Sequence, residues 1–305
     1  MPGPRTKHRW LKAAASVCVT VGLVTWLLAR ADHASLATYV AHVHLGWLGV
    51  ACALVPAQVL LSAARWRRMA CDLGMSMSWR SAVQEYALST FLNQVLPGGV
   101  TGDAVRVWRH RQGEGAVGPP LRAAVAERAT GHVAHLLLTL LGLVLWERLH
   151  GTSPPAGSMW LVLGLLAVFG LAFAVPGRVP GLGTAARDAR AALRSPGQLA
   201  YHAVVSGLLL LTFLAGFAAC AAALGQALGW AVVTAIPLVM LVMVVPFSVA
   251  GWGLREASAT VVLAVLGWSP EAALALSAAY GLSILVGSLP GAMVLLVRAP
   301  GRDAA

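Results

Sequence analysis

Long apolar runs alternate with short arginine-rich segments along this 305-residue chain. A transmembrane helix needs about 20 consecutive apolar residues. By that measure the clear spans are residues 13–29, 46–64, 124–146, 159–176, 199–224, 230–247 and 272–297. The runs are continuous and lack the period-two alternation of barrel strands. The pattern therefore predicts an all-α polytopic integral membrane protein, with about seven or eight transmembrane helices in a single membrane domain over residues 1–305.

Two segments do not fit simple spanning helices. Polar side chains recur every fourth position within residues 81–97, at Glu85, Ser89 and Asn93. That segment ends at Pro97-Gly98-Gly99, and a second interruption precedes the short apolar stretch 256–267. Irregular backbone at membrane depth is tolerated only where it is buried in protein or lines a wet cavity. We expect broken or re-entrant helices at both places. The sequence leaves open whether 81–97 and 256–267 cross the bilayer or return to the same side.

The two interruptions resemble each other. Without a gap, QVLPGGVTGDAVR (94–106) aligns with MVVPFSVAGWGLR (243–255), sharing the pattern P-x4-G-x3-R. Biased composition is one explanation. The other is an internal repeat, with weakly related halves over residues 13–150 and 158–297. Interrupted segments in matching halves of transporters point to a binding site near the midplane.

Composition and charge support the membrane assignment. The chain is 58% hydrophobic and only 11% charged, which is too few charges to cover a soluble surface. Its net charge is +11, and 19 of the 22 Lys and Arg residues fall in five clusters between the apolar runs. This distribution is typical of cytoplasmic loops and does not indicate a nucleic-acid partner. It predicts a bacterial-type cytoplasmic (inner) membrane protein with both termini cytoplasmic, including the basic segment 1–12. We interpret the signal-peptide-like start as an uncleaved first helix.

The interruptions carry the candidate chemistry. Pro and Gly break the helices, at Pro97, Gly98, Gly99, Gly102, Pro246, Gly251 and Gly253. A helix that starts after a break presents free N–H groups to a phosphate, and Arg106 and Arg255 could add bidentate contacts. Asp103 and Glu256 would balance their charge. The alternative is that each arginine pairs with its acidic neighbour and holds the loop in place.

A polar stripe follows the first interruption. Glu127 and Arg128 lie near the start of the next predicted helix, and Arg128, His132 and His135 share one face. The stripe could contact a lipid headgroup, transfer protons, or form a hydrogen-bonded seam between helices. We predict no cofactor and no metal site. The four cysteines form no CxxC pair, and His42 and His44 lack a third ligand.

These motifs together resemble the lysylphosphatidylglycerol synthase transmembrane-domain, or flippase-like, family. The matching elements are N-x-x-L-P-G-G…G-D-x-x-R, E-R-x-x-G and P-x-S…G-x-G-x-R-E, and the resemblance runs from about residue 10 to 297. It implies that the signature residues are Asn93, Gly102, Asp103, Arg106, Glu127, Arg128, Gly251, Gly253, Arg255 and Glu256. In multiple peptide resistance factor proteins, a domain of this type flips aminoacylated phosphatidylglycerol made by a C-terminal aminoacyltransferase domain.

This chain departs from that pattern in two ways. It stops at Ala305, so we expect no aminoacyltransferase domain. Trp252 lies between the glycines of the second motif, and Ala250 stands where a glycine is often found. Both features weaken the inference that this chain shares the lysyl-lipid substrate of those proteins.

Three functions are compatible with the sequence. The first is a lipid translocase, flippase- or scramblase-like, that moves a phosphate-bearing lipid, anionic or lipid-linked, between leaflets. No catalytic motif and no P-loop is present. The second is a membrane-embedded enzyme for lipid-linked or aminoacylated lipids, with Asp103 or Glu256 as a general base. The third is an accessory subunit for a separate lipid-modifying enzyme.

Overall fold

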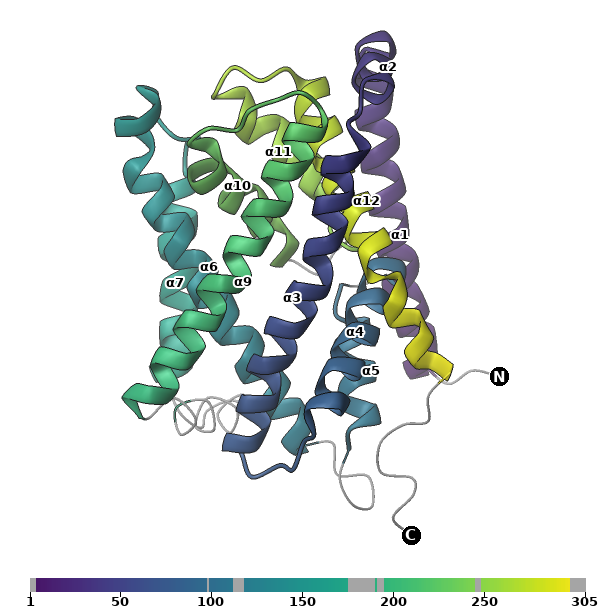
Figure 1. Ribbon diagram of the computed structural model, residues 1–305, viewed down its shortest axis with the longest axis vertical. Helices are drawn as coiled ribbons and strands as arrows, with labels where there is room; N and C mark the ends of the chain where they lie inside the picture. The colour runs from purple at the N-terminus through teal and green to yellow at the C-terminus, as the bar shows by residue number, and fades with distance from the viewer. Residues whose placement is uncertain are drawn as a thin grey trace.

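The computed structural model describes residues 4–97, 99–111, 118–174, 190, 195–244 and 248–296. Gly98 and Pro246, two of the predicted break residues, lie outside this set. Every regular element in the described part is helical (Figure 1). The elements are α1 (Pro4–Arg30), α2 (His33–Ala41), α3 (Leu45–Asp72), α4 (Trp79–Val95), α5 (Thr101–Arg109), α6 (Gly118–His150), α7 (Ser158–Ala174), α9 (Pro196–Ala223), α10 (Ala231–Leu241), η1 (Val242–Val244), α11 (Leu254–Ala264), α12 (Pro270–Ser288) and η2 (Leu289–Leu296).

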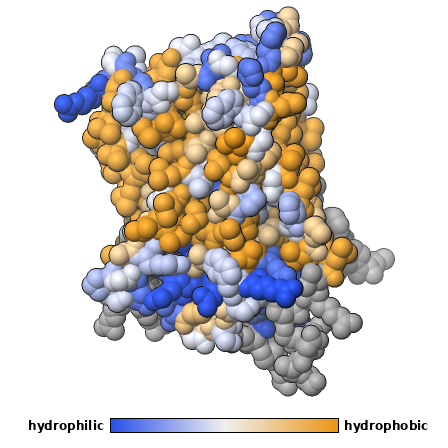
Figure 2. All heavy atoms as spheres, viewed as in Figure 1, coloured by the Kyte–Doolittle hydropathy of each residue, from blue (hydrophilic) through white to orange (hydrophobic). Residues whose placement is uncertain are grey.

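The prediction of an all-α membrane protein is confirmed. Four helical segments in the described residues are long and apolar enough to cross a bilayer: α3, α6, α9, and α12 continued by η2. The pair α1–α2, bent by 99°, would make a fifth. Figure 2 shows a broad apolar band with polar side chains gathered at both ends, as expected for a protein surrounded by lipid.

Among the described residues, fewer helices reach full spanning length than the seven or eight expected. The difference arises because several apolar runs form short helices. Both α4 and α7 have 17 residues, and both α10 and α11 have 11. At 1.5 Å per residue, 11 residues reach only about 16 Å, roughly half of the hydrocarbon core.

Both interrupted segments form re-entrant hairpins. In the first, α4 rises from one end of the molecule to about its middle, and α5 packs against α4 as it returns (Figure 1). In the second, α10 descends from the opposite end and α11 packs against α10 on its way back. We therefore predict that 81–97 does not cross the bilayer, and α11, which covers most of 256–267, is the returning arm of the second hairpin. The two hairpins point toward each other from opposite faces.

Close helix contacts hold the hairpins against the long helices. A Cβ on Gly142 of α6 would lie 2.7 Å from the Val233 carbonyl oxygen of α10. Pro237, four residues later, has no N–H to bond that carbonyl. A Cβ on Gly291 of η2 would lie 2.2 Å from the Ala87 carbonyl oxygen of α4. Small residues at such crossings let helix backbones approach closely, which is how helices associate in lipid.

The hairpin geometry predicts a labelling pattern. In a protein whose four native cysteines are replaced by serine, Ser78→Cys and Arg111→Cys flank α4–α5, and Ala227→Cys and Pro270→Cys flank α10–α11. A membrane-impermeant maleimide should label the first pair from one side of oriented vesicles and the second pair only from the other. Labelling of Ser78→Cys and Arg111→Cys from opposite sides would show that α4–α5 crosses the bilayer.

Candidate functional site

The first break is closed by side chains of its own hairpin. Thr101 Oγ1 donates to the carbonyl of Pro97 at 2.6 Å, and Asn93 Oδ1 accepts from the Gly102 N–H at 2.8 Å. A Cβ on Gly102 would lie 2.1 Å from the Ser89 carbonyl oxygen, so only glycine lets α5 approach α4 here. The start of α5 is thus capped by Asn93.

The second break has a different backbone. Ala250, Gly251 and Gly253 have φ angles of 51°, 81° and 83°, in the left-handed region that favours glycine. The Gly253 N–H donates to Glu256 Oε2 at 2.6 Å, which caps α11. In the shared register Thr101 corresponds to Ala250, yet α11 begins at Leu254, four residues later than α5. The shared P-x4-G-x3-R pattern therefore aligns the two arginines without placing them at the same position in their helices.

Arg106 is completely buried among protein partners. Its Nη2 donates to Asp103 Oδ1 at 2.9 Å and lies 3.7 Å from Glu127 Oε2. Its guanidinium carbon lies 4.4 Å from the ring centre of Trp66 and 4.5 Å from that of Tyr86. The aromatic rings and the carboxylates offset part of the loss of water around this charge, while its Nε and Nη1 are buried without a hydrogen-bond partner.

Arg255 has a parallel environment in the second hairpin. It is also completely buried, and its Nη2 donates to Glu256 Oε1 at 2.7 Å. Its Nε donates to Ser277 Oγ at 2.9 Å, and its guanidinium carbon lies 5.1 Å from the Trp252 ring centre and 5.6 Å from that of Tyr280. Both arginines thus pair with their acidic neighbours, which is the alternative that the sequence left open. Neither is positioned to touch a ligand directly.

Charged side chains of the first half form one continuous chain. Glu127 pairs with Arg65 at 3.3 Å and approaches Arg106, while Asp103 pairs with Arg106 and Arg128. The cluster contains three arginines and two carboxylates, so it carries one uncompensated positive charge. Arg128 is the member open to its surroundings, with 38% of its side chain exposed.

A cavity of about 270 Å³ lies where the hairpins meet. It is bounded by Gly99 of the first break and by Ser248, Ala250 and Gly251 of the second. Of the predicted site residues, the cavity brings together Asn93, Gly99, Glu127, Arg128, His132 and Gly251. It does not include Pro97, Gly102, Asp103, Arg106, Gly253, Arg255 or Glu256, which support its walls.

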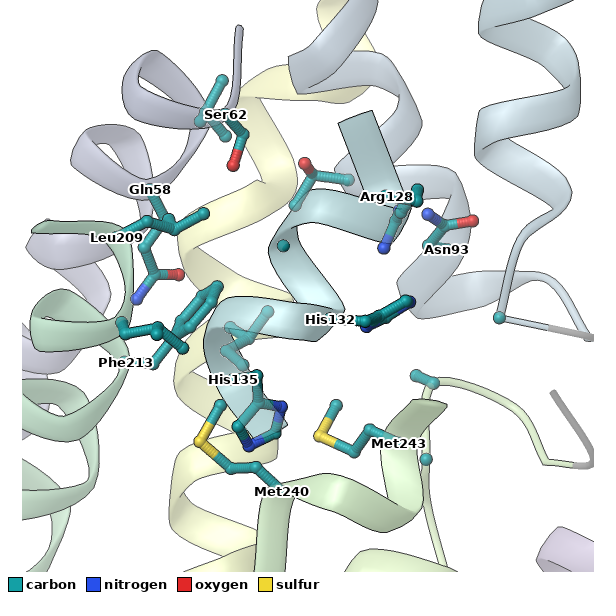
Figure 3. Close-up of a pocket in the computed structure, with 18 of the residues that line it drawn as sticks. Gln58, Ser62, Asn93, Arg128, His132, His135, Leu209, Phe213, Met240 and Met243 are labelled. Atoms are coloured by element: carbon teal, nitrogen blue, oxygen red, sulfur yellow. The ribbon is translucent and has the colours of Figure 1, made fainter. Parts of the chain in front are cut away.

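The cavity has two chemically different ends. Arg128 and Asn93 lie close together at one end, and His132 lies beside them (Figure 3). At the other end Met240 and Met243 flank His135, with apolar side chains of α9 nearby (Figure 3). His135 Nε2 lies 2.8 Å from the Pro237 carbonyl oxygen, which ties α6 to α10. The arrangement suits a ligand with an anionic group joined to an apolar portion.

Sequence reasoning missed the contribution of α3. Gln58, Ser62 and Arg65 all line the cavity and recur at i, i+4 and i+7. This is the spacing of one helix face, so the signal was present in the sequence. By sequence Arg65 falls in one of the five basic clusters that are typical of cytoplasmic loops, yet only 3% of its side chain is exposed and it donates to the Glu127 carbonyl oxygen.

No metal centre emerges from the described part of the chain, in which no three His, Cys, Asp or Glu side chains form a group that could hold an ion. The ionisable side chains that line the cavity instead include two arginines, Arg65 and Arg128, which can donate hydrogen bonds.

The fold and this cavity define a multi-pass α-helical membrane protein with a polar site between two opposed re-entrant hairpins. The family model described as the lysylphosphatidylglycerol synthase TM region matches residues 13–291, so the chain belongs to that family of membrane domains linked to lipid handling. Comparisons with curated proteins and with solved structures gave no match.

We expect glycine to be required at two positions that lie directly against buried arginines. A Cβ on Gly131 would lie 2.7 Å from Arg65 Nη2, and one on Gly281 would lie 2.2 Å from Arg255 Nη2. Gly131→Ala and Gly281→Ala should each lower the free energy of unfolding by about 1–3 kcal/mol, the usual effect of overpacking. Thermal unfolding of the purified protein in detergent would measure this loss.

Gly207→Ala on α9 is the matched control, because nothing lies within 4 Å of its added Cβ. It should leave stability unchanged or raise it slightly, since alanine favours a helix over glycine by about 1 kcal/mol. Equal effects at all three positions would contradict the assigned packing.

Proposed function

We propose that this protein is a lipid translocase that moves a phosphate-bearing lipid between the leaflets of the membrane. The observation that carries the proposal is the position of Arg128, a partly exposed cation of a net-positive cluster, in a cavity between hairpins that enter from opposite faces. Family membership supports a role in lipid handling. The membrane is proposed to be a bacterial-type cytoplasmic membrane, with both termini on the cytoplasmic side.

Arg128 is the proposed phosphate ligand. Its Nη2 donates to Asp103, and 38% of its side chain is exposed, so a guanidinium with five N–H donors can still reach a ligand. A guanidinium can hold two phosphate oxygens at once, and such charge-assisted bonds are stronger than neutral ones. Asn93 and His132 would add contacts beside it, while the lipid's acyl chains stay in the bilayer.

Movement would follow from the arrangement of the hairpins. In transporters built from repeats, one part rocks against another around a fixed midplane site. The methionine-lined end of the cavity suits such movement, because flexible thioether side chains repack easily. The chain has no P-loop, so transport would be downhill, coupled to an ion, or driven by a partner such as a separate lipid-modifying enzyme.

The burial of the candidate bases argues against an enzyme. Asp103 accepts from Ser89, Arg106 and Arg128, so both of its oxygens are occupied. Glu256 accepts from Gly253, Arg255 and Ser277. A general base must reach the proton that it removes, and neither carboxylate lines the central cavity. We therefore propose transport without covalent chemistry.

Leaflet exchange in proteoliposomes tests the proposal. A fluorescent anionic phospholipid should exchange in the presence of the native protein, and Arg128→Ala should slow this exchange roughly tenfold to a hundredfold. That range corresponds to losing about 1.5–3 kcal/mol from a hydrogen bond to a charged group. Dithionite quenching of the outer-leaflet probe measures the rate.

Arg148→Ala is the matched control, because Arg148 is exposed near the far end of the same helix. It should exchange lipid at the native rate. Arg106→Ala and Arg255→Ala are poor tests, because removing one partner of a buried pair costs about 3–5 kcal/mol of stability. Absence of exchange by the native protein with every phospholipid, with and without an ion gradient, would sink the translocase proposal.

A further inference from the structure

We infer that the cavity selects lipids whose headgroup carries a net negative charge and no ammonium group. This inference rests on the proposed function, because it names the class of lipid that the same site would take. It follows from the balance of charges around the cavity and from the way each nearby carboxylate is already used.

Positive charge predominates at the cavity surface. Three charged side chains line it, and two of them are the arginines Arg65 and Arg128; the third is Glu127. Directly behind the wall, Arg106 and Asp103 form a balanced pair. The lining and its immediate support thus leave one positive charge uncompensated in the low-dielectric interior, where it acts strongly on a ligand.

The second hairpin does not offset this charge. Arg255 and Glu256 form a balanced pair behind Tyr280, which is itself part of the cavity wall. The surplus cation of the first half therefore has no acidic counterpart across the cavity among the described residues.

An ammonium group would meet guanidinium groups at both carboxylates near the cavity. Asp103 is held by two arginines and a serine, while Glu127 lies 3.3 Å from Arg65 and 3.7 Å from Arg106, and its Oε2 is buried without a hydrogen bond. An incoming ammonium group would therefore have to enter beside guanidinium groups of like charge, which is unfavourable in the low-dielectric interior. The tyrosines of the wall offer little alternative, because Tyr86 and Tyr280 each already carry a guanidinium over the ring.

Selection would thus work by repulsion as well as by attraction. The partly exposed Arg128 favours a phosphate and disfavours a second cation near it, and specificity often depends on such unfavourable contacts. At about 270 Å³ the cavity is just below the range of about 300–1,000 Å³ typical of drug-sized ligands. It suits a compact headgroup with the acyl chains outside.

The test compares three lipids that carry the same fluorophore on the acyl chain: anionic phosphatidylglycerol, zwitterionic phosphatidylethanolamine and cationic lysylphosphatidylglycerol. Retention on the purified protein in detergent measures binding, and proteoliposome quenching measures exchange. We expect phosphatidylglycerol to be retained at least about tenfold better than the cationic lipid, with the zwitterionic lipid between them, and to exchange fastest.

Asn93→Asp is the sharpest variant. A carboxylate at this position still accepts the Gly102 N–H, so the cap of α5 is kept, while one negative charge is added beside Arg128 (Figure 3). This change should reduce the preference for the anionic lipid about tenfold. Arg128→Gln should do the same by removing the surplus cation, and Arg148→Gln should have no effect. Elution as a single peak in gel filtration would verify folding of each variant.

The outcomes separate the two proposals. Equal retention and equal exchange of all three lipids would overturn the charge selection and leave the translocase intact. Retention that favours the anionic lipid, without exchange of any lipid, would support the charge selection of the site and overturn translocation. A preference for the anionic lipid that Asn93→Asp and Arg128→Gln leave unchanged would overturn the assignment of selection to this cavity.

Discussion

The burial of arginine in the interior of a membrane protein is the constraint on which this structure depends. Arg106 and Arg255 are both completely inaccessible, and each lies close to two aromatic rings and a carboxylate. A buried charge without such partners would cost several kcal/mol. The partners come from several helices: Trp66 from α3, Tyr86 from α4 and Tyr280 from α12. One buried guanidinium in each re-entrant hairpin therefore contacts an aromatic ring of a long helix and fixes the hairpin to it.

The same constraint explains the glycines that accompany these charges. Gly131 of the E-R-x-x-G motif faces Arg65, and Gly281 faces Arg255, and in both cases a methyl group would collide with the guanidinium. Gly102 acts differently, since it lets α5 approach the Ser89 carbonyl of α4. The glycines therefore serve the packing of the hairpins more than they serve flexibility, and the breaks themselves are rigidly capped by Asn93 and Glu256.

Much of this architecture could be predicted from the sequence, because apolar length and helix breakers are local signals. The long spans, the two breaks and the polar stripe of α6 were all visible. Whether a break crosses or returns depends on tertiary packing, which no local signal carries. For Arg106 and Arg255 the sequence left two roles open and could not decide between them, since the rings near Arg106 lie 20 and 40 residues away. Arg65 was missed because its position next to Arg67 and Arg68 suggested a loop cluster.

The two halves differ in the one respect that matters for a ligand. In the second half, Arg255 and Glu256 neutralise each other, and Arg255 lies behind Tyr280 of the cavity wall. In the first half, five charges form a chain with an odd cation, and that surplus reaches the cavity at Arg128. The P-x4-G-x3-R pattern places one arginine in each half, yet the resulting site is asymmetric in charge. In the proposed translocase an anion would bind beside the first hairpin, with the neutral second hairpin forming the opposite wall of the cavity.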